Sequence, residues 1–220
     1  MNRRFVVILT AAFTLTAFAV SAYRYSLTNA PSPPVEAAAE DDRLVRSYSP
    51  VLGPQEAPVT IVEFFDPACE TCRAFHPLVK QIRQRFPTEV RVVVRYAAFH
   101  KGSDVAVRIL ETSRLQGKYE EVLEAILEAQ PRWAAHHNPD LDKAWDAAAA
   151  VGLDLRRARN DMLLPGITAT LNGDMADIRA IGVKKTPTFF VNGKPLTTFG
   201  AKPLIDLVIS EVERTRTKGS

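Results

Sequence analysis

The stretch VTIVEFFDPACETC, residues 59–72, contains both cysteines of the 220-residue chain and decides how the rest of it is interpreted. Its first half, residues 59–65, is β-branched or aromatic except for Glu63, a composition that predicts a strand. Asp66-Pro67 ends that run, and a proline at this point is typical of a residue at or just before a helix start. Cys69 and Cys72 are therefore expected at the beginning of a helix that follows an apolar strand.

Two cysteines in the pattern Cys-Glu-Thr-Cys can form a redox-active dithiol, supply half of a metal site or make a structural disulfide. A disulfide that closes so short a loop removes only about 2 kcal/mol of chain entropy from the unfolded state, and it joins no distant segments. A structural zinc site needs four ligands. The four histidines, His76, His100, His136 and His137, do not supply a finger-like spacing. The pattern therefore favours a reactive dithiol.

The first 22 residues have the layout of a secretory signal peptide. Arg3 and Arg4 precede an apolar run, residues 5–19, and small residues then allow cleavage after Ala22. The apolar run is also long enough to suggest the alternative of an uncleaved N-terminal anchor. We expect the rest of the chain to be exported to the periplasm or another extracytoplasmic space, where disulfides persist. It would be soluble after cleavage, or tethered to the inner membrane by residues 5–22.

The remainder divides into a linker and one domain. Residues 23–48 contain a stretch rich in proline, alanine and acidic groups without periodicity, which predicts a flexible tether. Residues 49–220 are numerous enough for one well-buried domain. The formal net charge is +3, and no basic stripe interleaved with aromatic residues is present to suggest a nucleic-acid partner.

The part of the domain that follows the cysteines predicts a βαβ unit. Apolar residues recur at three- and four-residue steps from Phe75 to Phe86, the pattern of an amphipathic helix. Residues 90–96 form a second run rich in valine. Strand, helix and strand at this spacing predict two parallel strands joined by a right-handed crossover.

A second unit lies near the C-terminus. Residues 188–191 and 194–199 flank Asn192-Gly193, which predicts a β-hairpin with a tight turn. An amphipathic helix is expected after Gly200. Between the two units, from about 102 to 182, nearly everything has a helical pattern. The sequence thus predicts an α/β architecture with a long helical insertion.

Four features in order make the chain resemble the thioredoxin superfamily, and within it the DsbA-like thiol–disulfide oxidoreductases. Cys69 and Cys72 open a helix after a strand. Glu63 lies six residues before Cys69, as the buried acid of the family does, and Pro77 matches the proline that kinks the active-site helix. Thr186-Pro187, just ahead of an FFVNG hairpin, matches the cis-proline loop of the family.

The resemblance covers about residues 49–215 and implies a thioredoxin fold, with βαβ and ββα halves and a helical insertion domain at about 102–182. It assigns attack to Cys69 and resolution of mixed disulfides to Cys72, and the helix N-terminus favours the Cys69 thiolate. Glu63 would be a buried carboxyl with a raised pKa that moves the proton of Cys72. The alternative for Glu63 is an edge-strand charge that points to water.

The resemblance also implies roles for the residues around the dithiol. Thr186 and Pro187 would lie against it and offer main-chain groups to an extended substrate. Glu70 and Thr71 stand where strong oxidases of the family have Pro-His. A carboxylate at Glu70 would disfavour the Cys69 thiolate and lower the reduction potential by roughly 30 mV, although Glu70 is also an ordinary favourable charge for a first helical turn. His76 is expected to be a surface or packed helix residue.

The sequence therefore predicts an exported, monomeric thiol–disulfide oxidoreductase that needs no cofactor beyond its own dithiol. Its partners would be exported proteins with cysteines and a membrane redox partner that reoxidises or reduces the dithiol. One alternative is a periplasmic copper(I)-handling protein that uses the two thiolates and His76, since soft sulfur ligands suit Cu(I). Another is a redox-inert peptide-binding protein, which would be expected to lack one of the two cysteines.

Overall fold

The structure, a computed structural model, describes residues 43–218. The signal peptide or anchor expected at residues 1–22, and most of the tether expected at 23–48, lie outside the described residues. Within residues 43–218, no helix has the length and apolar composition needed to cross a membrane.

A five-stranded mixed sheet forms the centre of the fold, in the order β1-β3-β2-β4-β5. Its two central strands, β2 (Val59–Phe65) and β3 (Val90–Tyr96), begin and end where their β-branched runs predict. They pair in parallel, which confirms the expected βαβ unit. The short β1 (Val51–Leu52) pairs antiparallel with β3, and β4 (Thr188–Val191) pairs antiparallel with β2.

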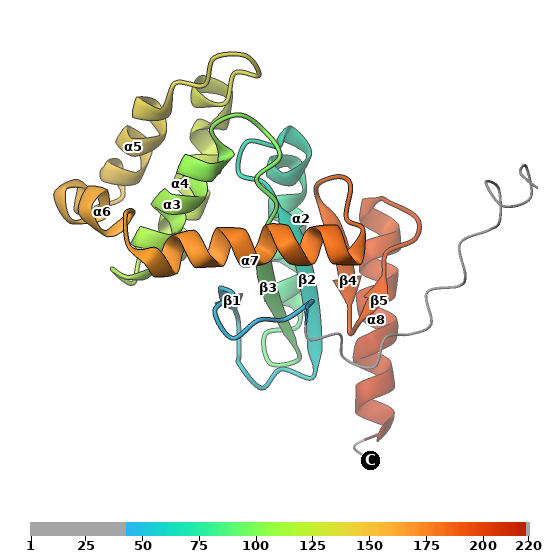
Figure 1. Cartoon of the computed structure of the whole chain (residues 1–220). Helices are drawn as coiled ribbons and strands as arrows, with labels where there is room; N and C mark the ends of the chain where they lie inside the picture. Colours follow the sequence, from blue (N-terminus) through green and yellow to red (C-terminus); the bar gives the residue numbers. More distant parts are fainter. Residues whose placement is uncertain (1–42, 219–220) are drawn as a thin grey trace, which may run out of the picture. The chain divides into compact units, whose positions relative to one another are not determined.

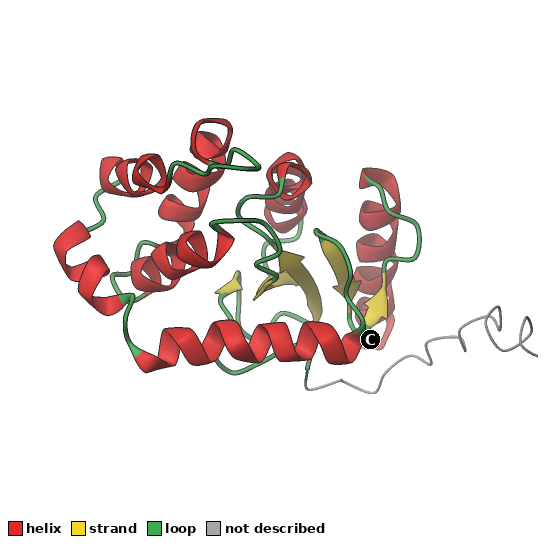
Figure 2. Ribbon diagram, turned by 45° about the horizontal axis from the view of Figure 1, so that its top comes forward, coloured by secondary structure: helices red, strands yellow, loops and turns green. Residues whose placement is uncertain are grey.

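Helices cover both faces of the sheet. The helices α2 (Glu70–Arg85) and α8 (Ala201–Lys218) lie on one face, and α7 (Pro165–Ile181) crosses the other, as Figures 1 and 2 show. Side chains alternate accordingly. Ile61 and Phe65 of β2 belong to the core under α2 and α8, whereas Val62 and Phe64 belong to the core under α7.

The helices of the insertion lie between β3 and β4 in the chain. They are α3 (Ser103–Arg114), α4 (Tyr119–Trp133), α5 (Leu141–Ala150), α6 (Leu155–Asp161) and α7, which returns the chain to the sheet (Figure 1). Together they occupy the range in which the sequence predicts a helical insertion. Trp133 and Trp145 of the insertion are buried in the core that it shares with α2 and α8.

The C-terminal hairpin is shorter than predicted. Asn192 and Gly193 both have positive φ, 47° and 77°, as a tight hairpin turn requires. However, β5 contains only Lys194–Pro195, and the expected strand to Phe199 is wrong. The physical reason is Pro195, which has no N–H to donate to a ladder; one further bond, from Leu196 N to Phe189 O at 2.9 Å, ends the pairing.

The last residues of the segment predicted to be a tether pack against the domain instead. Leu44 is 5% exposed. Arg46 forms two hydrogen bonds to the carboxylate of Asp177 on α7, at 2.8 and 2.7 Å. Tyr48 donates a hydrogen bond to Asp174 on the same helix. The packed part of the chain therefore begins before residue 49.

Candidate active site

Cys69 and Cys72 lie at the N-terminus of α2, directly after β2. Cys69 is the N-cap residue of the helix, and no side chain caps the helix in its place. Both cysteines are free thiols in the structure. Cys69 is 7% exposed and Cys72 is fully buried, so an incoming sulfur can approach only the first of the two.

The surroundings of the two sulfurs separate their acidities. A hydrogen bond from Cys72 lowers the pKa of Cys69 to about 5, against the opposing effect of burial, and Thr186 and the backbone N–H groups of Cys72 and Thr71 add to the lowering. Burial raises the pKa of Cys72 far above its ordinary value, and the shared hydrogen bond and the nearby charge of Glu63 raise it further. At neutral pH the pair therefore holds one thiolate, on Cys69, and one thiol, on Cys72.

The loop before β4 lies against the exposed side of Cys69. The peptide bond between Thr186 and Pro187 is cis. The carbonyl oxygen of Thr186 lies 3.4 Å from Cys69 Sγ, and Pro187 is buried. The structure thus brings the Thr186-Pro187 loop and the dithiol together, as the sequence predicts.

Glu63 is buried on the α2 side of β2, with 4% of its surface exposed. Burial raises its pKa to about 8, and the charge of Cys69 contributes to the rise. Its Oε1 has no hydrogen-bond partner among the described residues. A buried carboxyl oxygen without a partner favours the protonated form, so this group can accept and release a proton near neutral pH.

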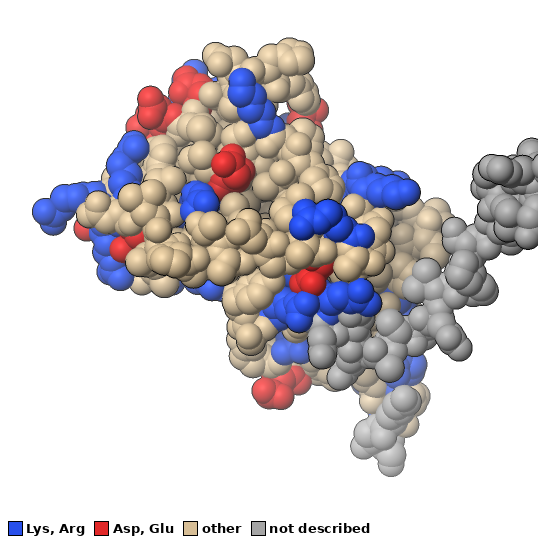
Figure 3. Space-filling view, in the orientation of Figure 1, with Lys and Arg blue, Asp and Glu red and all other residues tan. Residues whose placement is uncertain are grey.

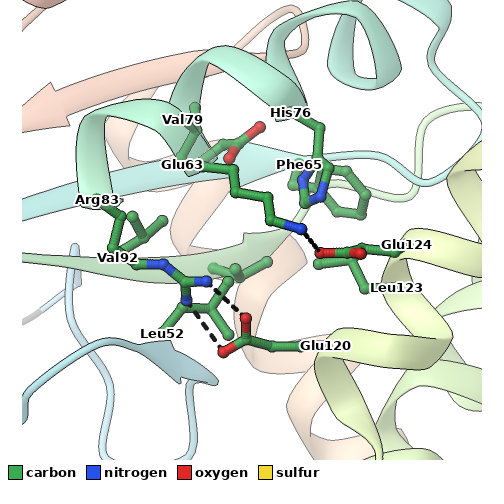
Figure 4. A pocket seen from close by; sticks show the side chains of 12 residues that line it. Leu52, Glu63, Phe65, His76, Val79, Arg83, Val92, Glu120, Leu123 and Glu124 are labelled. Carbon is green, nitrogen blue, oxygen red and sulfur yellow. Dashed lines mark hydrogen bonds and ion pairs between the residues drawn. The ribbon is translucent and has the colours of Figure 1, made fainter. Parts of the chain in front are cut away.

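A small cavity of about 20 Å³ lies beside Glu63, large enough for one water molecule. His76 lines the same cavity from α2, and its Nε2 is also buried without a partner among residues 43–218. Figure 4 shows this cavity, with the ion pairs of Glu120 and Glu124 from α4 at its edge. His76 is therefore half-buried between α2 and α4, one of the two positions predicted for it.

Glu70 and Thr71, the residues between the cysteines, are exposed. The Glu70 side chain is 75% exposed, and its Oε1 lies 3.9 Å from Nε2 of His136, which belongs to the loop after α4. The His136 side chain is 68% exposed.

Asp66 was missed by the sequence analysis, which treated it only as a residue that ends a strand. Its carboxylate is fully buried and accepts hydrogen bonds from the N–H of Ala68 at 2.8 Å and from the N–H of Phe99 at 2.8 Å. The side chains of Ser103 and His100 also contact it. Its own N–H lies 3.4 Å from Cys72 Sγ. The signal that could have identified it is local, because an aspartate that bonds the N–H two residues on makes an Asx turn.

No group of three or more His, Cys, Asp and Glu side chains suited to a metal ion occurs in the part of the chain that the structure describes. His76, proposed as a third copper ligand, instead faces the cavity beside Glu63.

On the face that Figure 3 shows, acidic and basic residues are scattered without a continuous basic stripe.

Comparison with known proteins gives one family. The model of a family described as "Thioredoxin" matches residues 46–201, which is more than half of the chain. A solved thioredoxin-like oxidoreductase from Silicibacter pomeroyi DSS-3 is 31% identical, with 81% of this chain and 99% of that chain covered and a TM-score of 0.68. Alpha-DsbA1 of Wolbachia pipientis, 17% identical, has the same fold, with a TM-score of 0.71 over 80% of this chain and 97% of its own.

A curated relative of a different name also matches. The Na(+)/H(+) antiporter NhaA of Herminiimonas arsenicoxydans is 28% identical over 169 residues, 76% of this chain. This chain spans only about a quarter of the length of that relative, 26%. The match therefore concerns one part of a much longer protein.

Proposed function

Because this chain belongs to the thioredoxin family, we propose that it is a DsbA-like oxidoreductase, which exchanges disulfides with cysteines of other exported proteins. The observation that carries the proposal is the asymmetry of the dithiol. Cys69 is a low-pKa sulfur at a helix N-terminus, with 7% of its surface exposed, and Cys72 is a fully buried thiol one turn further on. A nucleophile and a shielded resolving thiol need this arrangement.

The proposed exchange is reversible. A thiolate of a reduced client attacks Cys69 Sγ of the oxidised protein, a mixed disulfide forms, and the bond to Cys72 breaks. The electron pair of the broken bond stays on Cys72, which takes up a proton because its pKa is strongly raised. A second client thiolate then attacks the client sulfur and releases Cys69 as a thiolate. In the opposite direction, Cys69 attacks a client disulfide and Cys72 resolves the mixed disulfide.

We propose that Glu63 is the group that supplies the proton to Cys72. The carboxyl has a pKa of about 8 and interacts electrostatically with both sulfurs, so it can hold a proton when Cys72 is released as a thiolate. The cavity next to Glu63 has room for one water that can exchange a proton with the carboxyl, although neither cysteine lines this cavity. The acid thus supplies a proton that no solvent-exposed group can deliver to a fully buried sulfur.

The loop at Thr186-Pro187 is proposed to hold the client. The Thr186 carbonyl lies at the exposed side of Cys69, where an extended client segment can pair with main-chain groups as an added strand. In this binding mode the protein contacts the main chain of the client and not particular side chains. It therefore suits an enzyme that acts on many exported proteins.

The setting of this reaction is inferred from the sequence. Residues 1–22 have the layout of an export signal or an N-terminal anchor, so we propose a periplasmic or other extracytoplasmic location. There the protein would act as a monomer, and a membrane redox partner would return the dithiol to its working state. The antiporter activity named for the long relative is not part of this proposal, since this chain corresponds to 26% of that protein.

Trapping of mixed disulfides tests the assignment of the two cysteines. Cys72→Ala should accumulate mixed disulfides between Cys69 and exported proteins, because the resolving thiol is missing. Cys69→Ala should trap almost none, and the double variant serves as the blank. In the reduced wild-type protein, alkylation should modify Cys69 first. Faster alkylation of Cys72, or equal trapping by both single variants, would show that the roles are reversed or absent.

Glu63→Gln tests the proton assignment. The variant should slow exchange through Cys72, measured by stopped-flow oxidation of a cysteine-containing peptide, while circular dichroism shows an intact fold. Rates equal to those of the wild type from pH 5 to pH 9 would contradict a role for Glu63 in proton transfer.

A further inference from the structure

Gln130 lies near the end of α4, in the helical insertion, yet its side chain reaches the turn that carries the redox-active cysteine. It is 2% exposed. Its Nε2 donates one hydrogen bond to the carbonyl of Pro67 at 2.8 Å and another to the carbonyl of Cys69 at 3.0 Å. Its Oε1 accepts a hydrogen bond from Nε of Arg73 at 2.9 Å.

These contacts fix the orientation of the amide without ambiguity. A flipped amide would place its oxygen against two carbonyl oxygens and its NH₂ group against the guanidinium of Arg73, so all three hydrogen bonds would be lost. The two donors and one acceptor of Gln130 are therefore matched to this turn. The backbone around Gln130 is itself held, because its carbonyl accepts the N–H of Ala134 at 2.8 Å.

The two carbonyls that Gln130 holds lie on either side of the peptide unit that leads into Cys69. The carbonyl of Cys69 also accepts the N–H of Arg73, the first hydrogen bond of α2. Holding this carbonyl fixes the plane of the peptide that joins Cys69 to Glu70, and with it the direction of the N–H groups in the first helical turn. No side chain caps this helix, so Gln130 supplies orientation that a capping residue otherwise gives.

We propose that Gln130 is a positioning residue for the dithiol, which holds the backbone on both sides of Cys69 so that the N–H groups of the first turn of α2 face its sulfur. Through this side chain, the helical insertion takes part in setting the redox properties of a cysteine that it does not itself contain. The inference rests on the role proposed above for Cys69. Arg73 supports the amide from the surface of α2, because its positive charge polarises the Gln130 carbonyl and strengthens the two donors.

The test compares four variants. Gln130→Met keeps the length of the side chain and removes all three hydrogen bonds, and Gln130→Glu keeps only the acceptor for Arg73. Arg73→Met removes the support and leaves both donors. The control is Gln116→Leu, because Gln116 also bridges a backbone segment, with bonds to the carbonyl and N–H of Asp154, but lies in the turn after α3 and has no bond to the active-site turn among those of the described residues.

Two properties are measured for each variant: the pKa of Cys69, from the ultraviolet absorbance of the thiolate, and the reduction potential against glutathione. In Gln130→Met the thiolate fraction in the titration range should fall about tenfold, and the potential should become more negative by about 30 mV, the equivalent of a tenfold change for two electrons. Gln130→Glu should shift the thiolate fraction and the potential in the same direction. Arg73→Met should lower the thiolate fraction two- to threefold, and Gln116→Leu should leave both properties unchanged.

A Gln130→Met protein that has lost only free energy of unfolding, with the wild-type pKa and potential, would overturn the inference. So would a shift in Gln116→Leu as large as that in Gln130→Met. If neither Gln130 variant folds, Arg73→Met decides alone, because Arg73 is exposed and its removal does not disturb the core. A failure of this kind leaves the trapping and alkylation results unchanged, whereas an error in the role of Cys69 would appear there first.

Discussion

Glu63 and Arg95 are two buried ionisable residues on neighbouring strands, and they differ in whether the fold supplies them with partners. In the register of β2 and β3, Glu63 is opposite Val94 and Phe64 is opposite Arg95, so the two side chains leave the sheet on different faces. Arg95 faces α7 and is fully paired, with bonds to Asp174 at 2.9 Å and Asp177 at 2.7 Å. Glu63 faces α2 and keeps an oxygen without a partner among residues 43–218.

The difference in pairing indicates that Arg95 has a structural role and Glu63 a functional one. A buried charge that is fully paired fixes how elements pack, and in this protein Arg95 joins α7 and the N-terminal residues to β3. A buried carboxyl without partners lowers the free energy of unfolding whenever it ionises. Such a group is retained where its proton is used, which is the dithiol side of this sheet.

Removal of Arg95 should have the largest effect on stability. Arg95→Met leaves the carboxylates of Asp174 and Asp177 buried beside an apolar side chain, and breaking such a network costs about 3–5 kcal/mol. Urea denaturation followed by circular dichroism measures the loss. Addition of Asp174→Asn should recover part of it. A loss below about 1 kcal/mol would show that the network is better solvated than its burial indicates.

Glu63 should make stability depend on pH. Its pKa is about 8 in the folded protein and 4.5 when unperturbed, so between these values the unfolded chain is ionised while the folded protein holds the proton. The destabilising effect of Glu63 is therefore absent below pH 4.5, and the free energy of unfolding falls as the pH rises towards 8. About 2–3 kcal/mol should be lost between pH 5 and pH 7. In Glu63→Gln this part of the pH dependence should vanish. If the slope of the free energy of unfolding against pH is unchanged in the variant, the pH dependence arises from another group.

The sequence reveals one member of this pair and not the other, for a physical reason. Glu63 is conspicuous because it interrupts an apolar run at a fixed distance from the cysteines. Arg95 has partners 79 and 82 residues away on α7, and no local pattern predicts that contact. The bounds of β2 and β3 follow from local composition and were predicted correctly. The contacts of Asp66 and Gln130 with the active-site turn arise from tertiary packing, so they were missed.

Removal of the Tyr48 hydroxyl should have a smaller effect than removal of Arg95. The hydroxyl donates a 3.0 Å hydrogen bond to Asp174, and burial together with that carboxylate raises the pKa of Tyr48 to about 12. In Tyr48→Phe, Asp174 keeps its bonds from Arg95 and from the N–H of Tyr96. The expected loss is therefore about 1 kcal/mol, measured by urea denaturation. A loss equal to that of Arg95→Met would mean that the network fails when any one member is removed.

Glu70 is a second carboxylate beside the dithiol, and unlike Glu63 it is exposed to water. Its side chain is 75% exposed, against 4% of Glu63, so solvent and salt screen its charge. Glu70→Gln should lower the pKa of Cys69 by at most about half a unit at low salt, and should raise the reduction potential correspondingly. The shift should shrink at high salt. A fall in potential in Glu70→Gln, or no change at low salt, would show that the residues between the cysteines do not tune Cys69 through charge.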